Sequence, residues 1–219
     1  MISIENIGEV CGFRLARGIL GRAMYYTAAY WVDGLMIDTG CFYTVTELVS
    51  ALEKLNVDRV VSTHSHEDHI GANAALTKKF GAGILAHPLA IPVLAISRDQ
   101  KHLNPYQVVM WGYPEPSFAV PIPDTIQTAH HHFNVIHTPG HTGGSICLLG
   151  QNEIFTGDTL FADSIGRVDF PESSPQQMQT SLAKLSLLPD RLTTYPGHGP
   201  STSIGREKAH NPFLLRPGS

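Results

Sequence analysis

Three histidines and one aspartate stand within six residues of this chain, in the pattern HxHxDH. The residues are His64, His66, Asp68 and His69. Neutral imidazole nitrogens and carboxylate oxygens are the ligands that zinc and related divalent metals select. A solvated polar turn is the alternative interpretation, because the chain holds 12 histidines in 219 residues. The density of ligands in one hexapeptide favours a metal site.

Three further candidate ligands follow along the chain, each close to glycine after a short apolar run. They are His141, Asp158 and His198. Glycine lets the backbone turn tightly and approach an ion closely. A single Gly-Asp or Gly-His pair is more typical of an ordinary turn, but four such elements in chain order, each expected at a strand end, indicate a common site.

The elements expected to position these ligands are short strands and helices in alternation. The apolar run 57–63 predicts a buried strand, so that HxHxDH would occupy a loop at its C-terminal end. Residues 26–32 and 35–38 predict a hairpin around Asp33 and Gly34. Helical spacing predicts three amphipathic helices, the third opened by Ser173, Ser174 and Pro175, with apolar stripes in 45–55, 71–80 and 178–188.

With these residues in place, the chain resembles the metallo-β-lactamase superfamily, most closely its small glyoxalase II-like hydrolases. The resemblance extends over nearly the whole length and includes the segments IDTG at 37–40, SIGRVDFP at 164–171, IGREK at 204–208 and NPFL at 211–214. It implies an α/β (α+β) fold, a four-layer αββα sandwich, in a single domain over residues 1–219. The ligand pattern is highly specific for this fold and only weakly specific for substrate.

The resemblance also implies two divalent metal ions, most simply zinc, with iron or manganese as alternatives. Asp68 and Asp158 are the expected catalytic carboxylates, and a hydroxide bridging the metals is the expected nucleophile. Asp38 is implied as an outer residue that accepts a hydrogen bond from a ligand imidazole; its alternative role is a strand-end turn. The first metal would bind His64, His66 and His141, the second Asp68, His69 and His198, with Asp158 shared by both.

Substrate binding is implied for Arg167, Arg206 and Lys208, which match basic positions of glyoxalase II enzymes and offer cationic donors to a carboxylate. Surface solubility or helix-end charge is the alternative for each. The glutathione-binding tyrosines of that family are replaced here, and the long C-terminal helical domain is missing. The expected activity is therefore hydrolysis of a small thioester or ester.

Three other functions fit the same residues. One is a persulfide dioxygenase with a single iron at positions matching His64, His141 and Asp158. Another is a lactonase or β-lactamase on the same metal site. The last is a binding protein with a vestigial site, against which stands the retention of every ligand position.

The composition of the chain limits which kinds of partner are expected. The formal net charge of −4 argues against a broad nucleic-acid surface. Neither a spanning apolar stretch nor a signal peptide is evident, so we expect no membrane partner. Cys11, Cys41 and Cys147 lack paired spacing and predict reduced thiols in a cytoplasmic protein. A small-molecule substrate is the expected partner.

Two segments remain outside this scheme. Residues 97–124 are rich in proline and aromatic residues and lack clear periodicity, which predicts a lid over the site or a contact in a homodimer, unless the aromatics only pin the loop to the core. The run His130, His131 and His132 predicts a polar turn or strand edge, since no acidic residue adjoins it.

Overall fold

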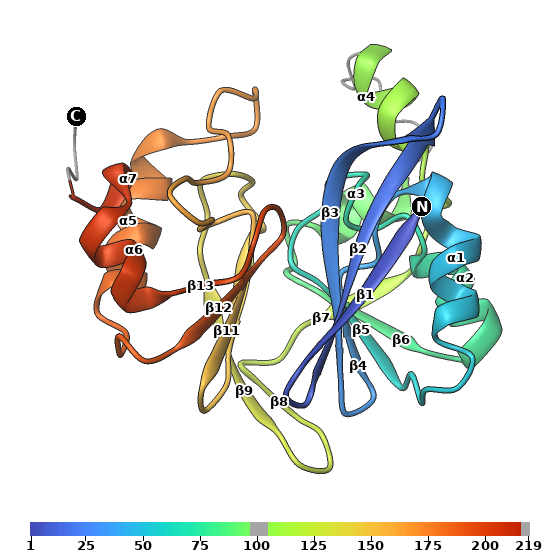
Figure 1. Ribbon diagram of the computed structural model, residues 1–219, viewed down its shortest axis with the longest axis horizontal. Coiled ribbons are helices and arrows are strands. Elements are labelled where there is room, and N and C mark those ends of the chain that lie inside the picture. Colours follow the sequence, from blue (N-terminus) through green and yellow to red (C-terminus); the bar gives the residue numbers. More distant parts are fainter. Residues whose placement is uncertain (97–104, 216–219) are drawn as a thin grey trace. The chain divides into compact units, whose positions relative to one another are not determined.

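The computed structural model describes residues 1–96 and 105–215. The chain divides into two compact units, an N-terminal unit, Met1–Ile122, and a C-terminal unit, Pro123–Ser219. Each unit is built on one β-sheet, so the mixed α/β composition and the presence of two sheets agree with the predicted fold class (Figure 1).

The N-terminal unit contains a seven-stranded sheet in the order β1-β2-β3-β4-β5-β6-β7. The first four strands pair antiparallel and the last four pair parallel. The strands are β1 (Ile2–Ile7), β2 (Val10–Ile19), β3 (Arg22–Val32), β4 (Leu35–Ile37), β5 (Arg59–Ser62), β6 (Gly83–Ala86) and β7 (Ala119–Pro121). The helices are η1 (Phe42–Thr44), α1 (Val45–Ala51), α2 (Asn73–Phe80), α3 (Ile91–Ala95) and α4 (Pro105–Trp111).

The parallel half of this sheet is stabilised because the apolar side chains of its strands are buried. Val60 and Val61 at the centre of β5 are fully buried. Leu48 of α1, Leu76 of α2 and Leu94 of α3 belong to the same core cluster, so these helices pack on the sheet. The predicted hairpin joins β3 to β4, with Asp33 at φ 47° and Gly34 at φ 81°, as a type I′ turn requires.

The C-terminal unit contains a six-stranded sheet in the order β13-β12-β11-β10-β9-β8. All pairs are antiparallel except β11 with β12. The strands are β8 (Thr125–Gln127), β9 (His132–His137), β10 (Ile146–Leu149), β11 (Glu153–Gly157), β12 (Thr193–Pro196) and β13 (Thr202–Ser203). The helices are α5 (Pro175–Ser186), α6 (Ile204–His210) and α7 (Pro212–Leu215).

Helix α5 begins as the sequence predicts. The Ser174 hydroxyl accepts a hydrogen bond from the amide of Gln177, and Pro175 occupies the first turn. Met178, Leu182 and Leu185 form its buried stripe, in one cluster with residues of β10 and β11.

The segment 97–124 differs from the expected loop. Residues 97–104 lie outside the described part, but the remainder of the segment includes α4 and the edge strand β7. Trp111 packs edge-on against Tyr25 and Tyr106, whereas Phe118 is 89% exposed. The sequence showed no helical period here because α4 spans only seven residues, the first of which is Pro105. A role as lid or homodimer contact stays a prediction.

The three cysteines carry free thiols, and burial raises the pKa of Cys147 to about 11. Within residues 1–96 and 105–215, no helix combines the length and apolar character needed to cross a bilayer.

Helix α6 carries a buried carboxylate, Glu207, at the centre of a hydrogen-bond network. Its oxygens accept from the amide of Asp163, the hydroxyl of Thr202, the side-chain amide of Asn211 and the guanidinium of Arg206. Burial is the largest single influence and opposes ionisation of Glu207, but these four hydrogen bonds together outweigh it and hold the pKa of the carboxyl below its ordinary value of 4.5.

Because the folded-state pKa of Glu207 is lowered, its ionised form stabilises the fold above the unfolded pKa, and this contribution is lost as the pH falls. Glu207→Gln should lower the free energy of unfolding by about 2 kcal/mol at pH 7, with a smaller difference below pH 4.5. Thermal unfolding of metal-free protein across pH measures both. Glu5→Gln, at an exposed strand position, is the control. A loss independent of pH would contradict the assignment.

Candidate metal centre

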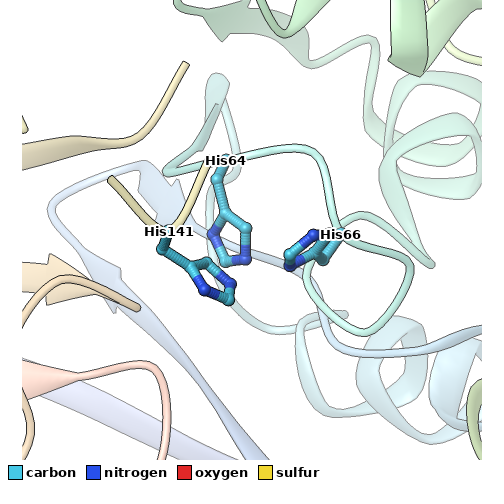
Figure 2. Close-up of side chains that lie close together, drawn as sticks. All are labelled: His64, His66 and His141. Carbon is cyan, nitrogen blue, oxygen red and sulfur yellow. The ribbon is translucent and has the colours of Figure 1, made fainter. Parts of the chain in front are cut away.

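The HxHxDH residues lie on the loop between β5 and α2, as the sequence predicts. His64 and His69 are fully buried, Asp68 is nearly so, and His66 is half-buried. The ring centroids of His64 and His66 are 4.9 Å apart, and those of His64 and His69 are 4.2 Å apart. Figure 2 shows the rings of His64 and His66 on this loop. The N-terminal unit therefore gathers three imidazoles and one carboxylate.

Asp38 ties this loop to the end of β4. Its Oδ1 accepts the backbone amide of Thr63 at 2.7 Å, and its Oδ2 accepts the Thr63 hydroxyl at 2.7 Å. Nδ1 of His69 lies 2.8 Å from the same Oδ2. An ionised carboxylate only accepts, so Nδ1 of His69 carries the proton and Nε2 carries the lone pair. Asp38 is thus placed to set the tautomer of one expected ligand.

The same carboxylate reaches His64 through Thr63. The Thr63 hydroxyl donates to Asp38 and lies 3.1 Å from Nδ1 of His64, so it is placed to accept the proton of that nitrogen. Donor and acceptor atoms of Asp38, His64 and His69 lie within 4.8 Å of one another, which this hydrogen-bond chain explains. Both rings are therefore oriented with the Nδ1 proton in a hydrogen bond and the lone pair on Nε2.

Backbone geometry holds Asp38 in this position. Asp38 has φ 56°, in the left-handed region that aspartate tolerates better than most residues. Its amide donates to Val61 O at 2.9 Å, and the next amide, of Thr39, donates to His69 O at 2.8 Å. A Cβ on Gly71 would lie 2.2 Å from the carbonyl carbon of Cys41, so the two backbone segments touch where only glycine fits.

Asp68 receives a hydrogen bond from a residue that the sequence did not single out. The hydroxyl of Thr27, on β3, donates to Oδ2 of Asp68 at 3.0 Å. Nε2 of His69 lies 3.7 Å from the same oxygen. No sequence signal identifies Thr27, because its role depends on the pairing of distant strands.

Glu67 is a second residue that sequence reasoning missed. Its side chain is 1% exposed, and neither carboxylate oxygen has a hydrogen-bond partner within the described residues. Burial, reinforced by the charge of Asp68, raises the pKa of Glu67 to about 7. Residue 67 is one of the x positions of HxHxDH, so the motif does not single it out. Only the burial of its side chain in the structure does.

In the C-terminal unit, His141, Asp158 and His198 lie close together at the ends of strands. Nε2 of His141 and Nε2 of His198 each lie 3.4 Å from Oδ2 of Asp158. The register of β11 against β12 shifts between Phe155 and Gly157, directly before Asp158. Such irregularities next to sites re-aim the following side chain.

The Nδ1 side of the His141 ring contacts a backbone carbonyl. Nδ1 of His141 lies 2.8 Å from the carbonyl oxygen of Arg167. A carbonyl only accepts, so Nδ1 carries the proton and Nε2 faces Asp158 with its lone pair. The edge of Phe170 contacts the same ring at a centroid distance of 6.0 Å.

Each unit thus carries a donor set that suits a divalent metal. The donors are imidazole nitrogens and carboxylate oxygens, buried or half-buried, with several rings fixed by hydrogen bonds at Nδ1. This chemistry fits zinc, iron and manganese and does not choose among them.

The three predicted substrate-binding cations already have partners. Arg167 pairs with Asp169 through two hydrogen bonds of 2.9 and 2.8 Å and lies over the ring of Phe170. Arg206 pairs in the same manner with Asp163. The ammonium of Lys208 donates to the Leu188 carbonyl at 2.6 Å and pairs with Asp190.

The triple-histidine run lies at the turn between β8 and β9, as predicted. His131 stacks on Phe133, and its Nδ1 lies 3.7 Å from Oε1 of Glu153. The expectation that no acidic residue adjoins the run holds in sequence but is wrong in space, because strand pairing brings Glu153 close.

Comparison with known proteins agrees with this donor set. A family model described as the metallo-beta-lactamase superfamily matches residues 25–198. Hydroxyacylglutathione hydrolase GloC from Haemophilus influenzae is 33% identical over 181 residues, which cover 76% of this chain and 81% of that protein.

Solved structures give the same result. TTHA1623 in a di-iron-bound form has a TM-score of 0.75 at 29% identity, covering 92% of this chain and 100% of that chain. The B3 metallo-beta-lactamase BLEG-1 has a TM-score of 0.73 at 27% identity, covering 99% of this chain and 100% of that chain. Since the family model spans most of the sequence and these neighbours share its fold, the chain belongs to the metallo-β-lactamase superfamily.

Proposed function

We propose that this protein is a dinuclear metal-dependent hydrolase of a small thioester or ester, similar to glyoxalase II. The observation that carries the proposal is the placement of one Asp158 oxygen at 3.4 Å from Nε2 of both His141 and His198. A carboxylate between two ligating imidazoles suits a position shared by two ions. The similarity to a hydroxyacylglutathione hydrolase supports a thioester as the substrate.

We assign seven metal ligands, taking the family pattern residue by residue. His64, His66 and His141 would hold one ion, Asp68, His69 and His198 the other, and Asp158 would be shared. When bound, the ions supply Lewis-acid activation of water and of the substrate carbonyl. The chain's own contribution is orientation, through Asp38 for His69 and His64 and through the Arg167 carbonyl for His141.

Among the predicted cations, Arg167 is the one we retain for substrate binding. The Arg167 side chain is 57% exposed and that of its partner Asp169 is 66% exposed, so solvent screens the pair and exchange for a substrate carboxylate costs little. The double pairing of Arg206 and the carbonyl contact of Lys208 favour scaffold roles for those two residues.

Several expectations stay predictions beside this proposal. They are the single-domain organisation, the cytoplasmic location, zinc as the native metal, the homodimer, and the absence of nucleic-acid and membrane partners.

The first prediction concerns Asp38. Asp38→Asn replaces one carboxylate oxygen by an NH₂ group, which donates hydrogen bonds and cannot accept them. The three donors around position 38 are left with one oxygen, so the Nδ1 proton of His69 loses its acceptor. We expect the dissociation constant for zinc to rise about 10–100-fold. Chelator competition measures it. Asp58→Asn, at an exposed position of the same unit, is the control and should bind zinc as the wild type does. Equal affinity of both variants would contradict the orienting role.

The second prediction concerns Asp158. Asp158→Ala removes the shared negative ligand, so we expect loss of one metal per chain and a fall in turnover of at least about 100-fold. Metal analysis and hydrolysis of S-lactoylglutathione, a non-glutathione thioester and a lactone measure both. Asp124→Ala, at an exposed position of the same unit, is the control.

The same panel tests the proposed function itself. Hydrolysis of a thioester by wild-type protein with two bound metals supports it. If the protein hydrolyses none of the three substrates and consumes oxygen with glutathione persulfide once iron is supplied, the persulfide dioxygenase replaces it. Preference for the lactone would place the protein with the lactonases.

The third prediction concerns Arg167. Arg167→Ala keeps the backbone carbonyl that holds His141, so metal content should not change. KM for an anionic thioester should rise with little change in kcat, as expected for lost uniform binding. Arg191→Ala, at an exposed position, is the control. A fall in kcat at unchanged KM would show that Arg167 acts on the reaction rather than on binding.

A further inference from the structure

The segment Phe161–Arg167 lies against two of the proposed metal ligands, Asp158 and His141. Phe161 and Ser164 form an isolated bridge, and Asp163 between them has φ 58°, in the left-handed region. The bridge closes a tight loop after Leu160, which is fully buried. The segment therefore leaves β11 and returns to the site with a defined backbone path.

Two backbone features of this segment touch the ligands. A Cβ on Gly166 would lie 1.9 Å from the Asp158 carbonyl oxygen and 3.1 Å from Cγ of His141, so the chain runs flush against both residues. The next residue, Arg167, accepts the Nδ1 proton of His141 with its carbonyl oxygen. Displacement of the segment by about 1 Å would carry this acceptor beyond hydrogen-bond distance of Nδ1.

The tail of the C-terminal unit anchors the far end of the segment. The side-chain amide nitrogen of Asn211 donates to Phe161 O at 3.3 Å, Ser164 O at 3.0 Å and Glu207 Oε2 at 2.9 Å. Glu207 Oε2 also accepts the amide of Asp163 at 2.8 Å. Both Asn211 and Glu207 are fully buried. One side chain thus bridges the two carbonyls that flank the left-handed residue.

We propose that Asn211 is a positioning residue for the metal centre: by clamping the Phe161–Ser164 turn, it fixes the Arg167 carbonyl that sets the tautomer of His141. The metal-related part of this role rests on the proposed function. No side chain of the tail needs to reach an ion, because the effect passes through the backbone of 161–167.

A purely structural role for Asn211 predicts something different. Loss of a buried amide that bonds two carbonyls would destabilise the fold in either case. Only the positioning role also predicts a change at the His141 ring in protein that is still folded. The test must therefore compare variants of equal stability.

The test uses the metal-free whole chain and long-range ¹H–¹⁵N NMR, with the His141 signals assigned from a His141→Gln spectrum. The wild type should show the Nδ1–H tautomer. Asn211→Ala should show a mixture of tautomers, and its dissociation constant for Co²⁺, measured by chelator competition, should rise at least about tenfold.

Ile126→Ala, at a buried position of the edge strand β8 and outside the core cluster that includes Leu160 and Ile165, is the control for destabilisation. It should keep the Nδ1–H tautomer and the wild-type Co²⁺ affinity. Asn211→Asp, which keeps the Oδ1 acceptor for the amide of Phe213 and removes the amide donors, is a second variant and should resemble Asn211→Ala.

Retention of the Nδ1–H tautomer in the Asn211 variants, with Co²⁺ affinity within twofold of Ile126→Ala, would overturn the proposal. Hydrolysis plays no part in either readout. If the wild type hydrolyses no substrate while the tautomer and Co²⁺ results hold, the positioning role stands and the proposed function fails.

Discussion

The hydrogen bonds of the buried Asp38 carboxylate are the interaction on which the proposed metal centre depends most. One side chain joins the end of β4 to the end of β5 through Thr63 and to the end of the HxHxDH loop through His69. A buried carboxylate without such donors would cost several kilocalories per mole, so the loop and the strand ends must stay together. The positions of the candidate ligands His64 and His69 therefore depend on the strand ends of this sheet.

In the C-terminal unit a different kind of acceptor orients the histidine ring. There the acceptor for His141 is the backbone carbonyl of Arg167, which has no negative charge. A backbone acceptor is only as precise as the path of its chain, which explains why Gly166 and the buried tail side chains matter. Carboxylate and carbonyl acceptors both leave the lone pair on Nε2, but they leave different basicity on the ring.

The sequence predicted the elements whose signals are local. The apolar run before HxHxDH became β5, Asp33 and Gly34 formed the hairpin turn, and Ser174 with Pro175 began α5. The candidate ligands could be named from the sequence because a metal site needs specific side chain types at strand ends; their binding of metal stays a prediction.

Other features depend on tertiary contacts that no local pattern encodes. The short helix α4 has too few residues to show a period. The burial of Glu67, the donation from Thr27 to Asp68 and the role of Asn211 arise only when distant segments meet. For the same reason, the pairing of Arg206 with Asp163 and Glu207 could not be predicted from the sequence.

The central claim is that these ligands hold two ions. X-ray absorption at the zinc edge, recorded on protein reconstituted with zinc and combined with metal analysis, tests it most directly. The account predicts two zinc ions per chain, a first shell of nitrogen and oxygen, and a zinc–zinc distance of about 3.5 Å. One zinc per chain with no neighbouring metal would contradict it.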